Sequence, residues 1–123
     1  MNVSNFSVLQ RQALLDLLVL AMYMDGNLAS AEEARVEQLL AAMGVDSDYD
    51  RNRDFDAAVT RVRQHSQSAE DARACVARLA GSFTTPEHRR KVYDTLSDLT
   101  ALDGQVSAEE SKFLAFVRNA FQI

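Results

Sequence analysis

Apolar residues recur at helical spacing in six segments of the chain, and no segment shows the period-two alternation of a strand. The first segment, about residues 8–24, is apolar on nearly every face, which is typical of a helix covered by other helices. Its main stripe consists of Leu14, Leu17, Leu18, Ala21 and Met24. The inward residues expected in the other five segments are Val36, Leu39, Leu40 and Met43; Phe55, Ala58, Val59 and Val62; Ala72, Cys75, Val76 and Leu79; Val92, Leu96 and Leu99; and Phe113, Leu114, Val117 and Phe121. The pattern therefore predicts an all-α fold with about six helices.

Capping residues and glycines mark where these helices begin and end. Capping boxes, in which a Ser and a Glu or Gln exchange hydrogen bonds with the backbone, are predicted at residues 7–10, 30–33 and 107–110. Ser68 precedes the fourth helix, and Thr85 followed by Pro86 starts the fifth. Helix ends are predicted at Gly26, Gly44, Gly81 and Gly104, because glycine tolerates the left-handed closing conformation. Residues 45–54 are polar and are predicted to connect the second and third helices.

The chain repeats itself at a distance of 78 residues. This shift superposes Asp16 on Asp94, Leu18 on Leu96, Asp25 on Asp103, Gly26 on Gly104, and Glu32 on Glu110. A one-residue gap would instead superpose the two Ser-Ala-Glu-Glu stretches and pair Glu33 with Glu110, and the sequence leaves both alignments open. The repeat predicts two helical hairpins packed with approximate twofold symmetry, within one domain that spans residues 1–123.

Each predicted hairpin turn carries an aspartate at the C-terminus of a helix, where the helix dipole is negative. A carboxylate there is unfavourable by about 0.3–1 kcal/mol, so a compensating partner is expected. In one interpretation, Asp25 and Asp103 accept hydrogen bonds from backbone N–H groups of the turns. In the other, they hold a cation together with Glu32 and Glu110, one turn into the following helices. Ligands that are all oxygen favour Ca²⁺, Mg²⁺ or Mn²⁺ over a soft metal.

Both turns contain the second half of an EF-hand calcium loop. "DGNLASAE" and "DGQVSAEE" each have Asp-Gly, a hydrophobic residue two positions after the glycine, and a glutamate seven positions after the aspartate. The loop also needs oxygen ligands two and four residues before the aspartate. The first copy has Tyr23 and Ala21 there, and the second has Ala101 and Leu99. A complete EF-hand is therefore not expected, although two half-loops brought together could form one oxygen-rich site.

Two stretches, "LVLAMYMDGNLASAEEARVEQLLAAMG" and "PEHRRKVYDTLSDLTALDGQVSAEESKFLAFVRNAF", resemble the TerB-like tellurite-resistance family, and the resemblance covers most of the chain. It implies an all-helical domain with an Asp-Gly turn in each half and a glutamate in the helix after each turn. It also implies a cytoplasmic, non-enzymatic stress-response module. The resemblance assigns divalent-metal binding to Asp25, Glu32, Asp103 and Glu110. Met24 and Leu102 depart from the family pattern, in which small residues commonly precede Asp-Gly.

Charge and cysteine content narrow the function classes. The net charge is −5, but residues 51–91 hold nine basic and five acidic residues. The acidity thus lies in the repeat regions, which argues against a nucleic-acid surface. The basic middle is interpreted as a solvated helical face or as a contact for an acidic partner. The only cysteine, Cys75, is expected to be a small buried hydrophobe. The N-terminus lacks a signal-peptide pattern, and the apolar run of 12 residues at 13–24 is short for a membrane span.

No catalytic motif is present in the sequence. The two histidines, His65 and His88, lie in no metal-binding pattern and are expected at solvated helix ends. Neither a phosphate-binding loop nor a nucleophile elbow occurs, so the chain is not expected to be an enzyme. Two functions stay open: a metal-binding stress-response module with an unidentified protein partner, and a purely structural helical interaction domain without metal.

Overall fold

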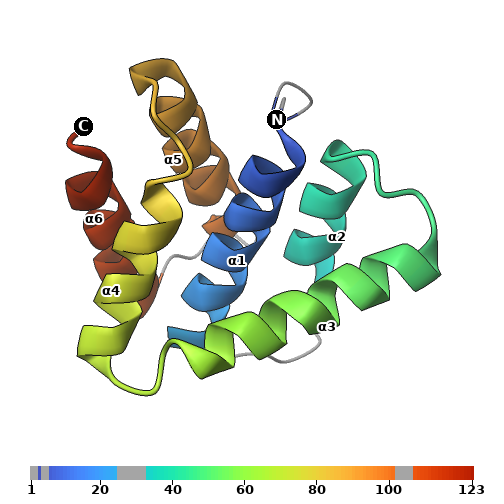
Figure 1. Cartoon of the computed structure of the whole chain (residues 1–123), viewed down its shortest axis with the longest axis horizontal. Helices are drawn as coiled ribbons and strands as arrows, with labels where there is room; N and C mark the ends of the chain where they lie inside the picture. Colours follow the sequence, from blue (N-terminus) through green and yellow to red (C-terminus); the bar gives the residue numbers. More distant parts are fainter. Residues whose placement is uncertain (1–2, 4–5, 25–32, 102–106) are drawn as a thin grey trace.

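The computed structural model describes residues 3, 6–24, 33–101 and 107–123, and these residues form six helices and no strand (Figure 1). The helices are α1 (Val8–Met24), α2 (Glu33–Ala42), α3 (Asp48–Gln64), α4 (Ala69–Ala80), α5 (Pro86–Thr100) and α6 (Ala108–Phe121). Helix α1 packs against every other helix and lies in the middle of the molecule in Figure 1. The predicted all-α class is therefore confirmed.

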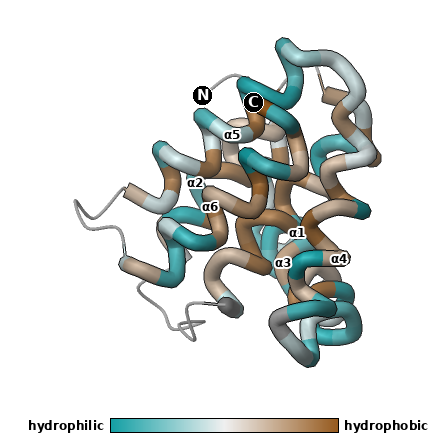
Figure 2. The backbone as a smooth tube through the Cα atoms, turned by 90° about the vertical axis from the view of Figure 1, so that its left-hand side faces the viewer, coloured by the Kyte–Doolittle hydropathy of each residue, from teal (hydrophilic) through white to brown (hydrophobic). Residues whose placement is uncertain are grey.

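The central position of α1 follows from its composition. Every residue from 13 to 22 is buried, and Leu14, Leu17 and Leu18 are fully excluded from solvent. Figure 2 shows hydrophobic stretches of the tube towards the centre of the molecule and hydrophilic stretches mostly on its outside. Removal of this apolar surface from water is the main driving force for the fold. Despite the apolar character of α1, no helix in the described ranges is long and apolar enough to cross a membrane.

The predicted capping residues are confirmed wherever the structure describes them. At α1, the Gln10 N–H donates to Ser7 Oγ at 3.1 Å, and the Ser7 N–H donates to Gln10 Oε1 at 3.0 Å. At α4 and α5, Ser68 and Thr85 accept from the backbone at 3.0 and 3.1 Å. Each bond satisfies an N–H that has no partner within its helix. The predicted box at residues 30–33 and the predicted helix ends at Gly26 and Gly104 rest on residues outside the described ranges.

The hairpins α1–α2 and α5–α6 repeat the same interactions at the 78-residue shift. Arg11 Nη1 donates to the carbonyl oxygen of Met43 at 3.1 Å. Its counterpart, Arg89 Nη1, donates to the carbonyl oxygen of Phe121 at 3.2 Å. In each hairpin, the arginine thus ties the first turn of one helix to the end of the next. The predicted helical hairpin repeats are confirmed.

The two hairpins also end in the same backbone motif. Gly44 and Gln122, which are 78 residues apart, have positive φ values of 85° and 59°. The following residues, Val45 and Ile123, donate their N–H groups back to the fifth residue before them at 3.0 and 3.3 Å. This is the Schellman arrangement, in which a left-handed residue closes the helix. The shift between equivalent residues is therefore 78 both in the helices before the Asp-Gly turns and at the ends of the helices after them. This constant shift supports the ungapped alignment of Glu32 with Glu110.

One predicted helix boundary is wrong. Helix α3 begins at Asp48, inside the predicted connector of residues 45–54. Ser47 caps it, and two aspartates in its first turn interact favourably with the positive end of the helix dipole. Arg51 Nε also donates to the carbonyl oxygen of Val45 at 2.7 Å, which holds the first turn in place.

The predictions for the histidines and for Cys75 have mixed outcomes. Cys75 is buried and His65 is exposed at the end of α3, both as expected. His88 lies in the first turn of α5, at a helix end as expected, but it is half-buried and thus less solvated than predicted. Its ring packs edge-on against the buried ring of Phe6, with 5.1 Å between ring centroids. Phe6, which precedes α1, thus packs against the first turn of α5.

Candidate functional site

Of the four predicted cation ligands, the structure describes only Glu110, at the start of α6. Asp25, Glu32 and Asp103 lie outside the described residues. Within the described part of the chain, no group of three or more His, Cys, Asp or Glu side chains is arranged to hold a metal ion. The four-residue cation site therefore stays a prediction, and the position of Glu110 is the structural evidence that bears on it.

Glu110 is buried and fixed by three hydrogen bonds. Its backbone N–H donates to Ser107 Oγ at 3.0 Å, and the Ser107 N–H donates to Glu110 Oε1 at 3.3 Å, which completes the predicted capping box. The other carboxylate oxygen, Oε2, accepts from Arg35 Nη1 at 2.9 Å. Both side chains of this ion pair are only 6% exposed. The carboxylate is therefore held in one orientation by its own helix and by α2.

The Arg35–Glu110 ion pair brings together the starts of α2 and α6. Arg35 is the third residue of α2, and Glu110 is the third residue of α6. Each of these helices directly follows one of the two Asp-Gly turns in the sequence. The pair thus joins the starts of the second helices of the two hairpins across the molecule.

Sequence reasoning missed Arg35. Arg35 stands four residues before Leu39 and therefore next to the buried face of α2, and this spacing could have indicated that its side chain is buried. The 78-residue shift superposes Arg35 on Phe113, which is fully buried in α6. The repeat therefore does not duplicate the ion pair, and only one half of the molecule supplies an arginine at this point.

A second buried carboxylate, that of Asp16 in α1, is not among the predicted site residues. Arg61 of α3 binds it with two hydrogen bonds, Nε to Oδ2 at 2.9 Å and Nη2 to Oδ1 at 2.8 Å. This two-point geometry is the strong form of an arginine–carboxylate pair. Its repeat counterpart, Asp94, is exposed. Asp16 was noted in the sequence only as a marker of the repeat, and Arg61 was not recognised as its partner. The pair explains how a charge is accommodated in the central helix.

These features define an all-helical protein that contains two equivalent helical hairpins, with a buried ion pair where the second helices of the hairpins begin. Residues 11–123 match the family model described as Tellurite resistance protein TerB. The chain therefore belongs to the TerB family, and the resemblance noted in the sequence is confirmed. Comparison with curated proteins and with solved structures gave no significant match.

Proposed function

We propose that this chain is a non-enzymatic, cytoplasmic stress-response module that forms a single domain over residues 1–123. In this proposal, Asp25, Glu32, Asp103 and Glu110 bind a divalent cation such as Ca²⁺, Mg²⁺ or Mn²⁺. The Arg35–Glu110 ion pair carries the proposal, because it shows that the starts of α2 and α6 meet. Each start follows an acidic turn, so carboxylates from both turns are attached to adjoining helix ends.

The charges near this point favour an added cation. The repeat supplies the same acidic residues twice, but it supplies Arg35 in one half and Phe113 in the other. One guanidinium cannot neutralise four carboxylates. Glu110 also keeps acceptor capacity, because a carboxylate has about four lone-pair sites and the described contacts use two of them. Hard divalent ions prefer such oxygen-rich surroundings.

One observation favours a second candidate, a structural interaction domain without metal. Both oxygens of Glu110 already accept hydrogen bonds, and Arg35 supplies a positive charge 2.9 Å from one of them. In this alternative, Arg35 takes the place of the metal and the acidic turns only end helices. The module would then act solely by binding a protein partner.

Thermal unfolding and calorimetric titration of the metal-free protein distinguish the two candidates. We expect Ca²⁺, Mg²⁺ or Mn²⁺ to raise the melting temperature, because a ligand held only by the folded state stabilises it by about 2.7 kcal/mol at 100 times its Kd. Zn²⁺ should have a smaller effect, since the predicted ligands include neither Cys nor His.

The variant Asp25→Asn/Asp103→Asn tests the ligands directly. Without an ion it should be more stable than the parent, because fewer carboxylates repel each other, and the ion should no longer raise its melting temperature. The control Asp94→Asn/Asp98→Asn makes the same change in charge at two exposed positions of α5 and should keep the response to the ion. No thermal shift with any ion, together with a destabilised Asp25→Asn/Asp103→Asn variant, would support the structural candidate instead.

A further inference from the structure

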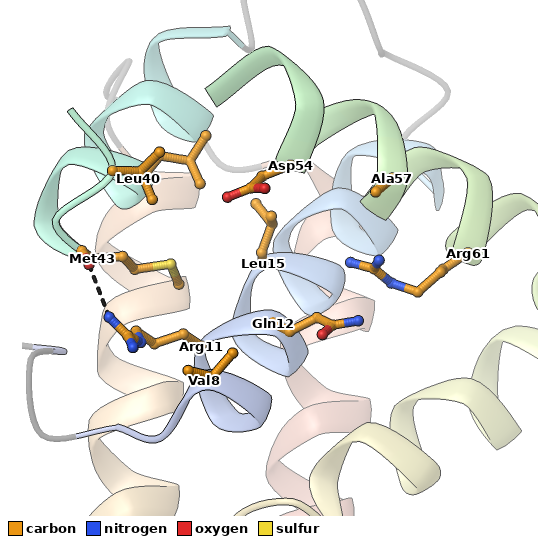
Figure 3. A pocket seen from close by; sticks show the side chains of 10 residues that line it. Val8, Arg11, Gln12, Leu15, Leu40, Met43, Asp54, Ala57 and Arg61 are labelled. Carbon is orange, nitrogen blue, oxygen red and sulfur yellow. Dashed lines mark hydrogen bonds between the residues drawn. The ribbon is translucent and has the colours of Figure 1, made fainter. Parts of the chain in front are cut away.

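Two hollows flank the first turns of α1. One has a volume of about 300 Å³ and lies between α1, α2 and α3, with Val8, Arg11 and Leu15 in its lining (Figure 3). The other, of about 240 Å³, lies between α1, α3 and α4 and is lined by Leu9 and Arg78 among others. Gln12 and Arg61 line both hollows. The two hollows are therefore parts of one surface, named here the α1 groove.

The α1 groove has an exposed apolar centre. Val8 and Leu9 are 70% and 73% exposed, and Tyr49 is the only other large hydrophobic residue exposed to this degree among those described. Val8 borders the first hollow and Leu9 the second. Met43 lies in the wall of the first hollow, and its flexible side chain can adapt to different apolar surfaces. Adjacent exposed apolar residues beside such hollows mark an interaction surface.

Arg11, in the first hollow, has a hydrogen-bond donor that nothing in the described structure satisfies. Its Nη1 donates to Met43 O, as drawn in Figure 3, but its buried Nε has no partner among the described residues. In the other hairpin, the Nε of the equivalent Arg89 donates to the carbonyl oxygen of Phe83 at 2.7 Å. A buried donor without an acceptor is unfavourable. That buried Nε is out of reach of a partner, so Arg11 contributes to the α1 groove as a positive charge in the lining of the first hollow.

Arg78, in the second hollow, adds a second positive charge. Its contact with Cys75 Sγ at 3.7 Å is not an ion pair, and no carboxylate of the described residues lies within salt-bridge distance of Arg78 or Arg11. Arg61 differs, because Asp16 neutralises it. One further carboxylate, that of Asp54, faces the first hollow, and the exposed Arg53 contacts it at 3.4 Å. Two arginines without a carboxylate partner thus flank an apolar centre in a chain whose net charge is −5.

We propose that the α1 groove binds an acidic amphipathic helix of a partner protein. Apolar side chains of that helix would cover Val8 and Leu9, and its carboxylates would pair with Arg11 and Arg78. This is the helix-in-groove mode of recognition, with charge complementarity at the sides. Nucleic acid fits less well, since it requires clustered basic residues and few apolar ones. The α1 groove is lined by residues 8–16 of α1, whereas the Asp-Gly turn follows the other end of this helix, after Met24, so this binding does not depend on the proposed cation site.

Fluorescence anisotropy with a labelled synthetic peptide tests the proposal. The probe is a helix of about 18 residues with leucines on one face and glutamates beside them, and a second probe has lysines in place of the glutamates. We expect binding of the glutamate probe that weakens as salt is raised, and much weaker binding of the lysine probe. Leu9→Ser and Arg78→Gln should each weaken binding of the glutamate probe at least about fivefold.

Two matched variants act as controls. Tyr49→Ser removes an equally exposed apolar residue, and Arg90→Gln removes an exposed arginine outside the α1 groove. Both should bind the glutamate probe within about twofold of the parent. Circular dichroism checks that all variants fold. The proposal is overturned if the glutamate probe does not bind at about 1 mM protein, if both probes bind equally, or if Leu9→Ser and Arg78→Gln bind like the controls.

Discussion

Removal of one partner from the Arg35–Glu110 ion pair should strongly destabilise the fold. In Arg35→Met, the flexible methionine fills much of the vacated space, but the carboxylate of Glu110 stays buried without its positive partner. Breaking a buried ion pair from one side costs about 3–5 kcal/mol. Glu110 keeps its hydrogen bond from the Ser107 N–H, so we expect a loss near the lower end, about 3 kcal/mol. This is a large part of the roughly 5–15 kcal/mol that stabilises a typical domain.

A double-mutant cycle isolates the interaction. Glu110→Gln removes the carboxylate beside Arg35 and should also be destabilising. The double variant Arg35→Met/Glu110→Gln removes both charges of this pair, so its loss should be smaller than the sum of the two single losses. The expected coupling energy is about 1–3 kcal/mol, measured by urea unfolding followed by circular dichroism.

The neighbouring Glu109 and Lys112 provide a matched control on the same helix. Their side chains are 51% and 68% exposed and their charged atoms are 4.0 Å apart. Glu109→Gln and Lys112→Met should each change the free energy of unfolding by no more than about 0.5 kcal/mol. If Arg35→Met costs less than about 1 kcal/mol and the coupling is below about 0.5 kcal/mol, the buried pair does not hold α2 to α6 and the reasoning is wrong. If the cation proposal is correct, Arg35→Met should also bind the ion more tightly, because a positive charge beside the ligands has been removed.

Two further predictions concern the core and the helix ends. Leu18→Ala should lower the free energy of unfolding by about 2–5 kcal/mol, because it opens a cavity in the fully buried face of α1. The control Glu37→Ala, on the exposed face of α2, should change the free energy of unfolding by less than about 0.5 kcal/mol. Equal denaturation midpoints for the two variants would contradict the central position of α1. Gly44→Ala should be destabilising by about 1 kcal/mol because the backbone φ of 85° is unfavourable for alanine; a Cβ at this position meets no atom within 4 Å, so no clash contributes. At the equivalent position, Gln122→Gly should be stabilising by up to about 1 kcal/mol. If the melting temperatures of the two variants shift in the same direction, the left-handed helix ends are not equivalent as described.

The sequence alone determined the helices, most of their ends and the repeat. These features depend on interactions between residues that are close along the chain. A capping bond such as that from Gln10 to Ser7 spans three residues, and the apolar face of a helix recurs every three or four. The same local rules failed for α3, where Ser47 and the acidic first turn form a helix start that the polar composition had concealed. They also identified Glu110 as a capping residue, but they did not identify its partner.

The tertiary structure decided which charges pair and which surfaces stay open. Arg35 lies 75 residues from Glu110, and Arg61 lies 45 residues from Asp16, so neither pair follows from spacing along the chain. The α1 groove likewise combines residues from α1, α2, α3 and α4. Such neighbours are set by the angles and depths at which helices pack, and these depend on the side chains of all the packed faces together. The 78-residue repeat predicts equivalent hairpins, but the position that holds Arg35 in the first hairpin, where it pairs with Glu110 of the second, holds the buried apolar Phe113 in the second.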